Sequence, residues 1–534
     1  MVTALAIGSI IVLVCISFGQ FIHRFGMPAL VIFLVLGIIA GSLPFEYSVI
    51  EPPIAANVGE AALIFVMFYG GFGTNWKIAR TVAVKAGMLA SLGVIITAGA
   101  VMLFTVLVFH LSWIEGFLFG SIIGCTDAAS VFSILRSKKM NLKHNTVSVL
   151  EIENGSNDPT AYLLTLVALL IMQGGSLWDV PLLVAKQIVF GVGIGIGIAV
   201  LAVPVILRFS KHFADGMDLV FVFAIAILTF ALAQLLGGNG YLAAFLCGII
   251  LGNSKIPNKV RMAHFFDSVD WLGQIMIFFF LGLLVTPANL IPAILPAIAL
   301  ALFLLFIARP LAVFLIFRLR GSPLNQCLLI SWVGLRGAAS LVFAVLAITS
   351  GVVLQSDIFH IVVLTAFFSI LIQGTLLEPM AKRLNMIDTE TDVMQSFTDF
   401  QEHSEKAFLK IRLDPGHAWV GHDLKSLDVG QNSLIVLIKR GNQTIAPKGD
   451  TVLMPDDIVV MTAESYTDTD DGMHVERRII EKEDPWAHLL ISDLGLPSNA
   501  LIVAVEKKDG TQVTPKGWTK INPEDAVTII TWDA

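Results

Sequence analysis

Two short polar segments lie inside long apolar stretches of this chain. The first is E-N-G-S-N-D at residues 153–158, and the second is T-D at residues 126–127. Hard monovalent cations prefer carboxylate, amide and hydroxyl oxygens as ligands, and a carboxylate also takes up a proton. Neither segment is accompanied by a cluster of His or Cys, which argues against a transition-metal site. The two segments therefore indicate a site for a monovalent cation or a proton.

Asp127 and Asp158 carry this hypothesis. Asp127 lies nine residues before Arg136, which is about 14 Å along a helix. Asp158 lies 11 residues after Val147, which is about 16 Å. If both helices start at the same membrane surface, the two carboxylates share one depth near the midplane. Acids at that depth cost several kcal/mol and usually face a wet cavity, so we expect both to function in transport.

Three basic residues also lie inside apolar stretches: Lys186, Arg309 and Arg336. Lys186 lies close to a span end, where its ammonium group reaches the interface. Arg309 precedes Pro310, and two alternatives stay open for it: a structural contact to freed carbonyls or a role in coupling. Glu153 is expected to form a structural ion pair with Arg336. One arginine does not neutralise three acids, so at least one acid is left to bind a cation or proton.

Both polar segments contain residues that disfavour a regular helix. Thr126 follows Gly120 and Gly124, and residues 154–159 read N-G-S-N-D-P. Glycine, asparagine and proline weaken a helix interior, and a loosened turn frees carbonyl oxygens. We therefore expect interrupted helices at both places, with Asn154 and Asn157 beside the carboxylates as candidate ligands.

The composition is that of a membrane protein with a soluble tail. The 534 residues are 56% hydrophobic and 14% charged. Residues 1–385 hold 20 Lys/Arg and 15 Asp/Glu, a net charge of about +5, whereas the remainder holds 14 and 26, about −12. The four cysteines all lie in apolar stretches, so no disulfide framework is expected. The N-terminal apolar run is interpreted as a retained span, with a signal peptide as the alternative.

About 20 apolar residues cross a bilayer. This length predicts thirteen spans, near residues 3–22, 28–41, 57–72, 86–109, 112–136, 147–172, 181–208, 217–236, 240–253, 269–286, 290–317, 324–349 and 357–377. The Lys and Arg residues of the loops occur in alternate loops only. This pattern predicts that the chain lies in the cytoplasmic (inner) membrane, with its N-terminus outside and its tail in the cytoplasm.

Two heptapeptides suggest an internal repeat. G-C-T-D-A-A-S at 124–130 and G-L-R-G-A-A-S at 334–340 agree at four of seven positions. The predicted topology runs the two spans in opposite directions, as an inverted-repeat transporter requires. The expected fold is an all-α polytopic membrane protein of about 13 helices, with inverted repeats and crossed interrupted helices. A small β-rich α+β tail follows it.

These residues resemble the NhaP-type monovalent cation–proton antiporters, near their potassium–proton branch. The resemblance covers all thirteen spans and rests on T-D in span five, E-x-x-x-N-D in span six and G-L-R-G in span twelve. It implies that Asp158 is the shared cation and proton site, completed by Asp127 and the backbone of Thr126. It further implies that Asn157 supports the site and that Glu153 pairs with Arg336. The family also implies a homodimer, a moving core domain and one-for-one electroneutral exchange.

Two departures from the family leave the choice between K⁺ and Na⁺ open. Relatives commonly have Ser where this chain has Asn154, and an acid where it has Tyr69. K⁺–H⁺ exchange is favoured, and Na⁺–H⁺ exchange with a purely structural tail is the alternative. A ligand-gated cation channel is a third reading, but it lacks a filter such as T-V-G-Y-G. No enzymatic activity, cofactor or nucleic-acid partner is expected.

The tail contains a repeat of short β-rich runs, which start at Asn432 and Asn499. The first copy resembles the C-terminal lobe of potassium-conductance regulatory (TrkA-C) domains, and the second is a degenerate copy. Such lobes bind small ligands, so the tail is either a gate or a structural element. A nucleotide-like anion near Lys448 and Lys516 is a conceivable ligand. The expected organisation is a membrane domain (1–385), a linker (386–405), a lobe (406–465), a linker (466–485) and a second lobe (486–534).

Overall fold

The structure is a computed structural model. It describes residues 29–42, 52–138, 140–209 and 216–388 of the helical part, and residues 406–414, 419–427, 434–440, 443–445, 447–464, 473–480, 484–497, 500–507, 512–513 and 515–532 of the tail, with residues 13, 17 and 417. The expected first span, 3–22, therefore lies almost wholly outside the described residues. The chain forms two compact units, Met1–Gln401 and Glu402–Ala534, and each is described by itself.

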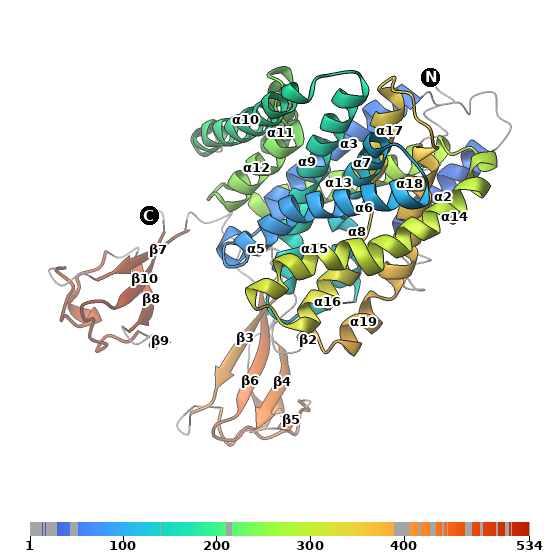
Figure 1. Cartoon of the computed structure of the whole chain (residues 1–534). Coiled ribbons are helices and arrows are strands. Elements are labelled where there is room, and N and C mark those ends of the chain that lie inside the picture. Colours follow the sequence, from blue (N-terminus) through green and yellow to red (C-terminus); the bar gives the residue numbers. More distant parts are fainter. Residues whose placement is uncertain are drawn as a thin grey trace. The chain divides into compact units, whose positions relative to one another are not determined.

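The first unit is helical, and the expected spans two to thirteen each coincide with a helix or a run of helices (Figure 1). Among the described residues, six helices are long and apolar enough to cross a membrane, and a seventh span forms if a pair of helices bent by 47° is counted as one. The chain is thus a multi-pass membrane protein. Its helices are α2 (Ala29–Gly41), α3 (Pro52–Gly73), α4 (Trp76–Ala79), α5 (Ala83–Met88), η1 (Leu89–Gly93), α6 (Val94–Val108), α7 (Trp113–Ile123), α8 (Ala128–Ser137), α9 (Thr146–Met172), η2 (Leu177–Asp179), α10 (Val180–Phe209), α11 (Met217–Leu235), α12 (Gly240–Asn253), α13 (Lys259–Leu283), α14 (Pro287–Phe303), η4 (Leu304–Ala308), α15 (Arg309–Ile316), η5 (Arg318–Arg320), α16 (Leu324–Trp332), α17 (Ala338–Thr349), α18 (Ile358–Ser369), η6 (Ile370–Gly374) and α19 (Leu377–Arg383).

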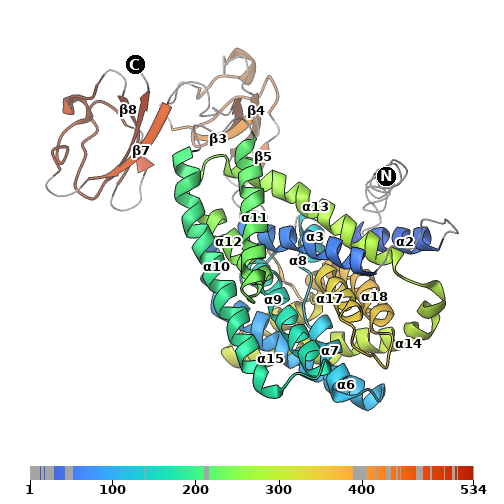
Figure 2. The same cartoon turned by 90° about the horizontal axis from the view of Figure 1, so that it is seen from above.

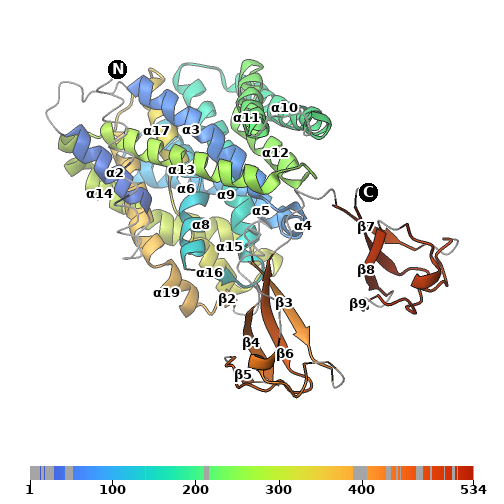
Figure 3. The ribbon, with the colours of Figure 1, turned by 180° about the vertical axis from the view of Figure 1, so that it is seen from behind.

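Glycines allow several of these helices to pack backbone to backbone. Gly71 of α3 and Gly248 of α12 each leave no room for a Cβ, because a carbonyl oxygen of the other helix occupies that space. Gly37 of α2 and Gly282 of α13 make the same kind of approach, and Figure 3 shows these two helices side by side. Small residues let membrane helices approach closely where lipid supplies no hydrophobic driving force. Helices α10 and α11 also lie side by side, at one edge of the helical unit (Figure 2).

Spans five and twelve are interrupted, as expected. Helix α7 ends at Ile123 and α8 begins at Ala128, while α16 ends at Trp332 and α17 begins at Ala338. The two breaks coincide with the two similar heptapeptides, 124–130 and 334–340. The similar sequences therefore form the same structural feature, an interruption of a helix.

The expectation of a loosened turn in span six is wrong. Helix α9 runs without interruption through Asn154–Pro159. A neighbouring helix supports it at the proline, since Asn239, the N-cap of α12, donates its side-chain N–H to the Pro159 carbonyl at 2.9 Å. Neighbours often satisfy the backbone around a proline inside a membrane, and this support keeps α9 helical.

The tail consists of two small antiparallel sheets with the same topology. The first has the order β3 (Lys406–Arg412), β6 (Ile458–Glu464), β4 (Leu434–Arg440), β5 (Gln443–Ile445). The second has the order β7 (Met473–Ile479), β10 (Ala526–Trp532), β8 (Ala500–Glu506), β9 (Gln512–Val513). Strand β7 lies in the segment expected to be a linker, because its charged residues hide the alternation typical of a strand.

Corresponding residues of the two sheets repeat one structural motif. Arg440 forms an ion pair with buried Asp457 at 2.7 Å, and Lys507 forms one with buried Asp525 at 2.7 Å. The residue before each aspartate has positive φ, 68° at Asp456 and 70° at Glu524. The predicted repeat is therefore also a repeat in three dimensions.

The buried ion pair of the first sheet generates a stability prediction. Asp457 accepts hydrogen bonds from the Arg440 guanidinium and from the Met454 N–H, and these lower the pKa of its carboxyl below the ordinary value. Asp457→Asn is therefore expected to destabilise the tail by about 1–3 kcal/mol at neutral pH. Since the folded-state pKa is depressed, the stabilisation is complete above the unfolded pKa of about 3.9 and is lost as the pH falls through the folded-state value.

Limited proteolysis of the tail in the full-length protein, followed against temperature and pH, measures this effect. Asp456→Asn is the matched control, because the Asp456–Arg412 pair is exposed and Asn tolerates positive φ. If both variants lose the same amount of stability, the buried pair contributes no more to the stability of the tail than the exposed pair does.

Candidate functional site

The two helix breaks meet in the interior of the helical unit. The Asp127 N–H donates to the Leu335 carbonyl at 2.8 Å, and the Arg336 guanidinium donates to the Cys125 carbonyl. Gly337 allows this approach, since a Cβ at that position would overlap the Asp127 side chain. Each break thus supplies partners for peptide groups that the other break leaves outside a helix.

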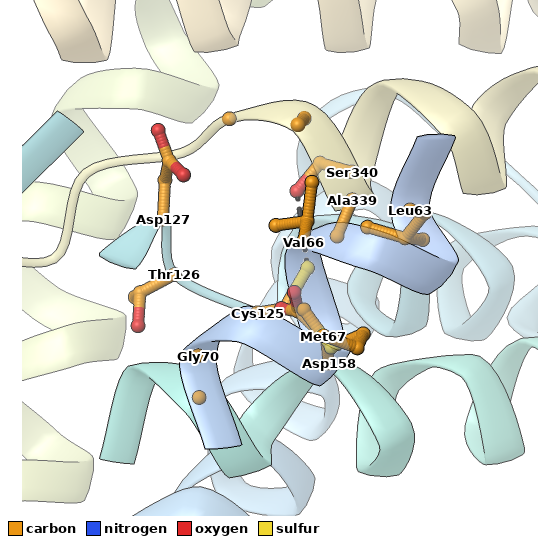
Figure 4. A pocket seen from close by; sticks show the side chains of 13 residues that line it. Leu63, Val66, Met67, Gly70, Cys125, Thr126, Asp127, Asp158, Ala339 and Ser340 are labelled. Carbon is orange, nitrogen blue, oxygen red and sulfur yellow. Dashed lines mark hydrogen bonds between the residues drawn. The ribbon is translucent and has the colours of Figure 1, made fainter. Parts of the chain in front are cut away.

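A cavity of about 30 Å³ lies at this junction (Figure 4). A space of this size is large enough for a water molecule or an ion without its hydration shell. Figure 4 shows Cys125, Asp158 and Ser340 on one side of it, and Thr126 and Asp127 on the other. Its lining comes from α3 (Leu63, Val66, Met67, Gly70), the first break (Cys125, Thr126, Asp127), α9 (Gly155, Asp158) and the second break with the start of α17 (Gly337, Ala338, Ala339, Ser340).

The two aspartates that line this cavity are held differently. Asp127 accepts hydrogen bonds from the N–H and the hydroxyl of Ser130, in the first turn of α8. Asp158 is only 6% exposed, and its Oδ1 has no hydrogen-bond partner within the described part of the chain. A buried carboxylate oxygen without a partner is costly unless a proton or a cation accompanies it. Asp158 is thus the acid that is left available.

The other candidate ligands form a network beside the cavity. The Thr126 hydroxyl lies 2.6 Å from Asn154 Oδ1 and 3.1 Å from Glu153 Oε1. The Asn157 amide donates to the Thr126 hydroxyl at 2.5 Å and to Glu153 Oε1 at 3.1 Å. Asn154 and Asn157 do not line the cavity, whereas Thr126 does. The asparagines therefore hold Thr126 in place.

The expected ion pair between Glu153 and Arg336 is wrong. Glu153 pairs with Arg309, whose Nη1 and Nη2 lie 3.0 and 2.9 Å from the two carboxylate oxygens. The pair is fully buried, with 3% of the arginine and none of the glutamate side chain exposed. Arg309 directly follows the π-helical turn η4, which changes the direction of its side chain relative to a regular α-helix. Residue spacing alone does not reveal such a turn.

Arg336 occupies a different environment. Apart from its bond to the Cys125 carbonyl, its Nε and Nη2 have no partner within the described residues, although the side chain is 1% exposed. The positive charge of Arg336 therefore lies where the two helix breaks meet, and not beside Glu153. Arg309 contacts a carboxylate rather than the freed carbonyls of the first alternative, and its role in coupling stays a prediction.

Sequence reasoning missed three residues of this site: Cys125, Ser130 and Ser340. The Cys125 thiol lies 3.2 Å from the Ser340 hydroxyl, and Ser130 binds Asp127. Ser130 and Ser340 are the matching last residues of the two heptapeptides, so the repeat contained the signal for both. Tyr69, which replaces an acid of the family, donates to Asp267 at 2.8 Å and does not line the cavity.

Comparisons with known proteins found matches over most of the chain. The family model "Sodium/hydrogen exchanger, transmembrane" matches residues 9–383, and the TrkA-C domain matches residues 408–465. The K(+)/H(+) antiporter NhaP of Alkalimonas amylolytica is 36% identical over 72% of this chain and 67% of its own. The K(+)/H(+) antiporter NhaP2 of Shewanella oneidensis is 32% identical over 85% of this chain and 80% of its own. The sodium proton antiporter MjNhaP1 of Methanocaldococcus jannaschii has the same helical fold, with a TM-score of 0.62 at 22% identity, covering 72% of this chain and 99% of that one.

The contact between Glu153 and Arg309 predicts thermodynamic coupling. Glu153→Gln or Arg309→Gln leaves one buried charge without its partner, which is expected to cost about 3–5 kcal/mol of stability. The double variant should be less destabilised than the sum of the two single variants, and thermal unfolding of the purified protein measures this difference. The matched cycle with Arg336→Gln should give the smaller coupling, because Arg336 does not contact Glu153. A larger coupling with Arg336 would contradict the observed pairing.

Proposed function

Because the chain belongs to the sodium/hydrogen exchanger family, whose members are transporters and not enzymes, we propose that it exchanges a monovalent cation for H⁺. We favour K⁺ over Na⁺ as the cation. The two relatives named K(+)/H(+) antiporters support K⁺, since one of them matches over 85% of this chain. Exchange for Na⁺ is the second candidate, supported by the fold shared with the sodium proton antiporter MjNhaP1.

The observation that carries the proposal is the Asp158 carboxylate on the cavity, whose Oδ1 has no hydrogen-bond partner within the described residues. One carboxylate cannot hold a proton and a cation at once, so the two ions compete for it. Asp127 and the Thr126 backbone complete the cation site, whereas Asn154 and Asn157 act through Thr126. Exchange follows if this site opens to only one side at a time and changes sides only when it is occupied.

This mechanism implies electroneutral exchange. Each passage of the site moves either one cation or one proton, so a full cycle moves no net charge. Buried Glu153 and Arg309 neutralise each other. We place the protein in the cytoplasmic membrane, with an outer N-terminus and the tail in the cytoplasm, because the Lys and Arg residues of its loops are confined to alternate loops. We also propose that it forms a homodimer, as the family resemblance implies.

The tail is proposed to gate transport. Its first lobe matches the TrkA-C domain, and the second lobe repeats the strand order of the first. An anionic, nucleotide-like ligand would meet exposed Lys448 of the first lobe and Lys516 of the second, whose ammonium lies 5.3 Å from the Trp518 ring centre. A regulator of this kind acts only if it contacts the transport states differently. A tail that merely stabilises the carrier is the competing reading.

Asp158→Asn is expected to abolish exchange in a folded protein. The amide keeps the size of the side chain but neither takes up a proton nor carries the negative charge that attracts a cation. Proton movement in reconstituted vesicles, titrated with K⁺ and with Na⁺, measures the loss. Glu115→Gln is a suitable control, since Glu115 is a buried acid outside the cavity whose oxygens accept N–H groups of Gln355 and Ser356. Near-normal exchange by Asp158→Asn would refute the assignment.

Removal of the tail tests the gate. A chain that ends at Gln401, the last residue of the first unit, keeps the helical unit complete. If the tail gates transport, this chain should show an altered rate or an altered dependence on pH and cation concentration. Exchange in vesicles is compared between the full-length and shortened proteins at equal dimer content. Superimposable curves would mean that the tail is structural.

A further inference from the structure

One half-buried carboxylate of α3, that of Glu60, lies outside the site described above. Glu60 of α3 is half-buried and has no hydrogen-bond or ion-pair partner within the described residues. It lies one turn before Leu63 on α3, and Leu63, Met67 and Gly70 line the Asp158 cavity. This spacing places Glu60 on the same side of the helix as the cavity-lining residues, one turn closer to the start of α3.

Two tyrosines lie beside the turn of α9 that follows Asp158. Tyr162 follows Asp158 by one turn on α9, and its ring meets the Tyr241 ring edge-on with 5.0 Å between centroids. Tyr241, in the first turn of α12, is 1% exposed, and its hydroxyl has no hydrogen-bond partner within the described residues. The Tyr162 hydroxyl differs, because it accepts a hydrogen bond from Gln234 at 3.1 Å.

These residues all lie toward one membrane surface. Asn239, directly before α12, binds the Pro159 carbonyl of α9, so Tyr241 lies beside the turn of α9 that follows Asp158. Helices α3 and α12 run in the same direction and contact each other through Gly71 and Gly248. The start of α3, the start of α12 and the end of α9 therefore face the same surface. In the predicted topology this is the outer surface.

We propose that Glu60 is a second binding residue for the transported cation, on the path between Asp158 and the membrane surface where α3 begins, with the Tyr241 hydroxyl as the contact between the two carboxylates. This proposal rests on the proposed function. A carboxylate at the mouth of a low-dielectric path raises the local concentration of cations. An unpartnered hydroxyl supplies an oxygen ligand further along the path, and the rings of Tyr162 and Tyr241 close the path in this conformation.

Oriented membrane vesicles test the proposal. Right-side-out vesicles offer K⁺ to the outer surface, and everted vesicles offer it to the inner one. Glu60→Gln is expected to raise the K⁺ concentration for half-maximal exchange on the order of tenfold from the outer surface only. Glu60→Asp should keep the K⁺ concentration for half-maximal exchange close to that of the parent protein. Tyr241→Phe should raise this concentration by a smaller factor than Glu60→Gln. The variant should fold normally, since the hydroxyl that it removes has no hydrogen-bond partner within the described residues.

Asp179→Asn is the matched control, because Asp179 is an exposed acid in the turn between α9 and α10, at the same surface. The proposal is overturned if Glu60→Gln and Tyr241→Phe behave like this control, or if K⁺ dependence changes equally from both surfaces. Failure of this inference is distinguishable from failure of the proposed function. If only the inference about Glu60 fails, Asp158→Asn still abolishes exchange. If the proposed function fails, the parent protein shows no exchange or Asp158→Asn retains exchange.

Discussion

Peptide groups that leave a helix inside a membrane need partners, because lipid offers no hydrogen bonds. This requirement explains the centre of the helical unit. Helices α7 and α16 both stop within the apolar region, and the free segments that follow bind each other through Asp127, Leu335, Cys125 and Arg336. Gly337 permits the approach. The cavity, the position of Asp127 and the buried Arg336 all depend on this mutual support.

The charges around the cavity divide into two groups with different roles. Glu153 and Arg309 neutralise each other in a bidentate contact without access to water, so they form a fixed part of the structure. Asp127, Asp158 and Arg336 remain near the cavity. Since an isolated charge is costly there, the proposed binding of a proton or a cation at Asp158 would also stabilise the whole arrangement. A carrier needs this property, because the site must not cross the membrane empty.

The tail shows how a repeated sequence yields a repeated sheet. Each lobe has a buried aspartate directly after a residue of positive φ. In each lobe this aspartate forms an ion pair with a basic residue that lies earlier in the same lobe, Arg440 in the first and Lys507 in the second. Arginine serves in one lobe and lysine in the other. The second lobe therefore keeps the structural core of the first.

The sequence by itself determined the membrane class, the positions of the described helices, the two interrupted helices, the placing of Asp127 and Asp158 at one cavity, and the repeat in the tail. These features follow from local properties: apolar length, glycine content, and the high cost of an acid in hydrocarbon. Only the tertiary structure decided that Glu153 pairs with Arg309, that α9 continues through Pro159, and that Asn154 and Asn157 lie beside the cavity rather than on it. Each of these depends on the rotation of one helix relative to its neighbours. A π-helical turn before Arg309 and a side chain from α12 at Pro159 set those rotations, and neither is visible in the spacing of residues along one segment.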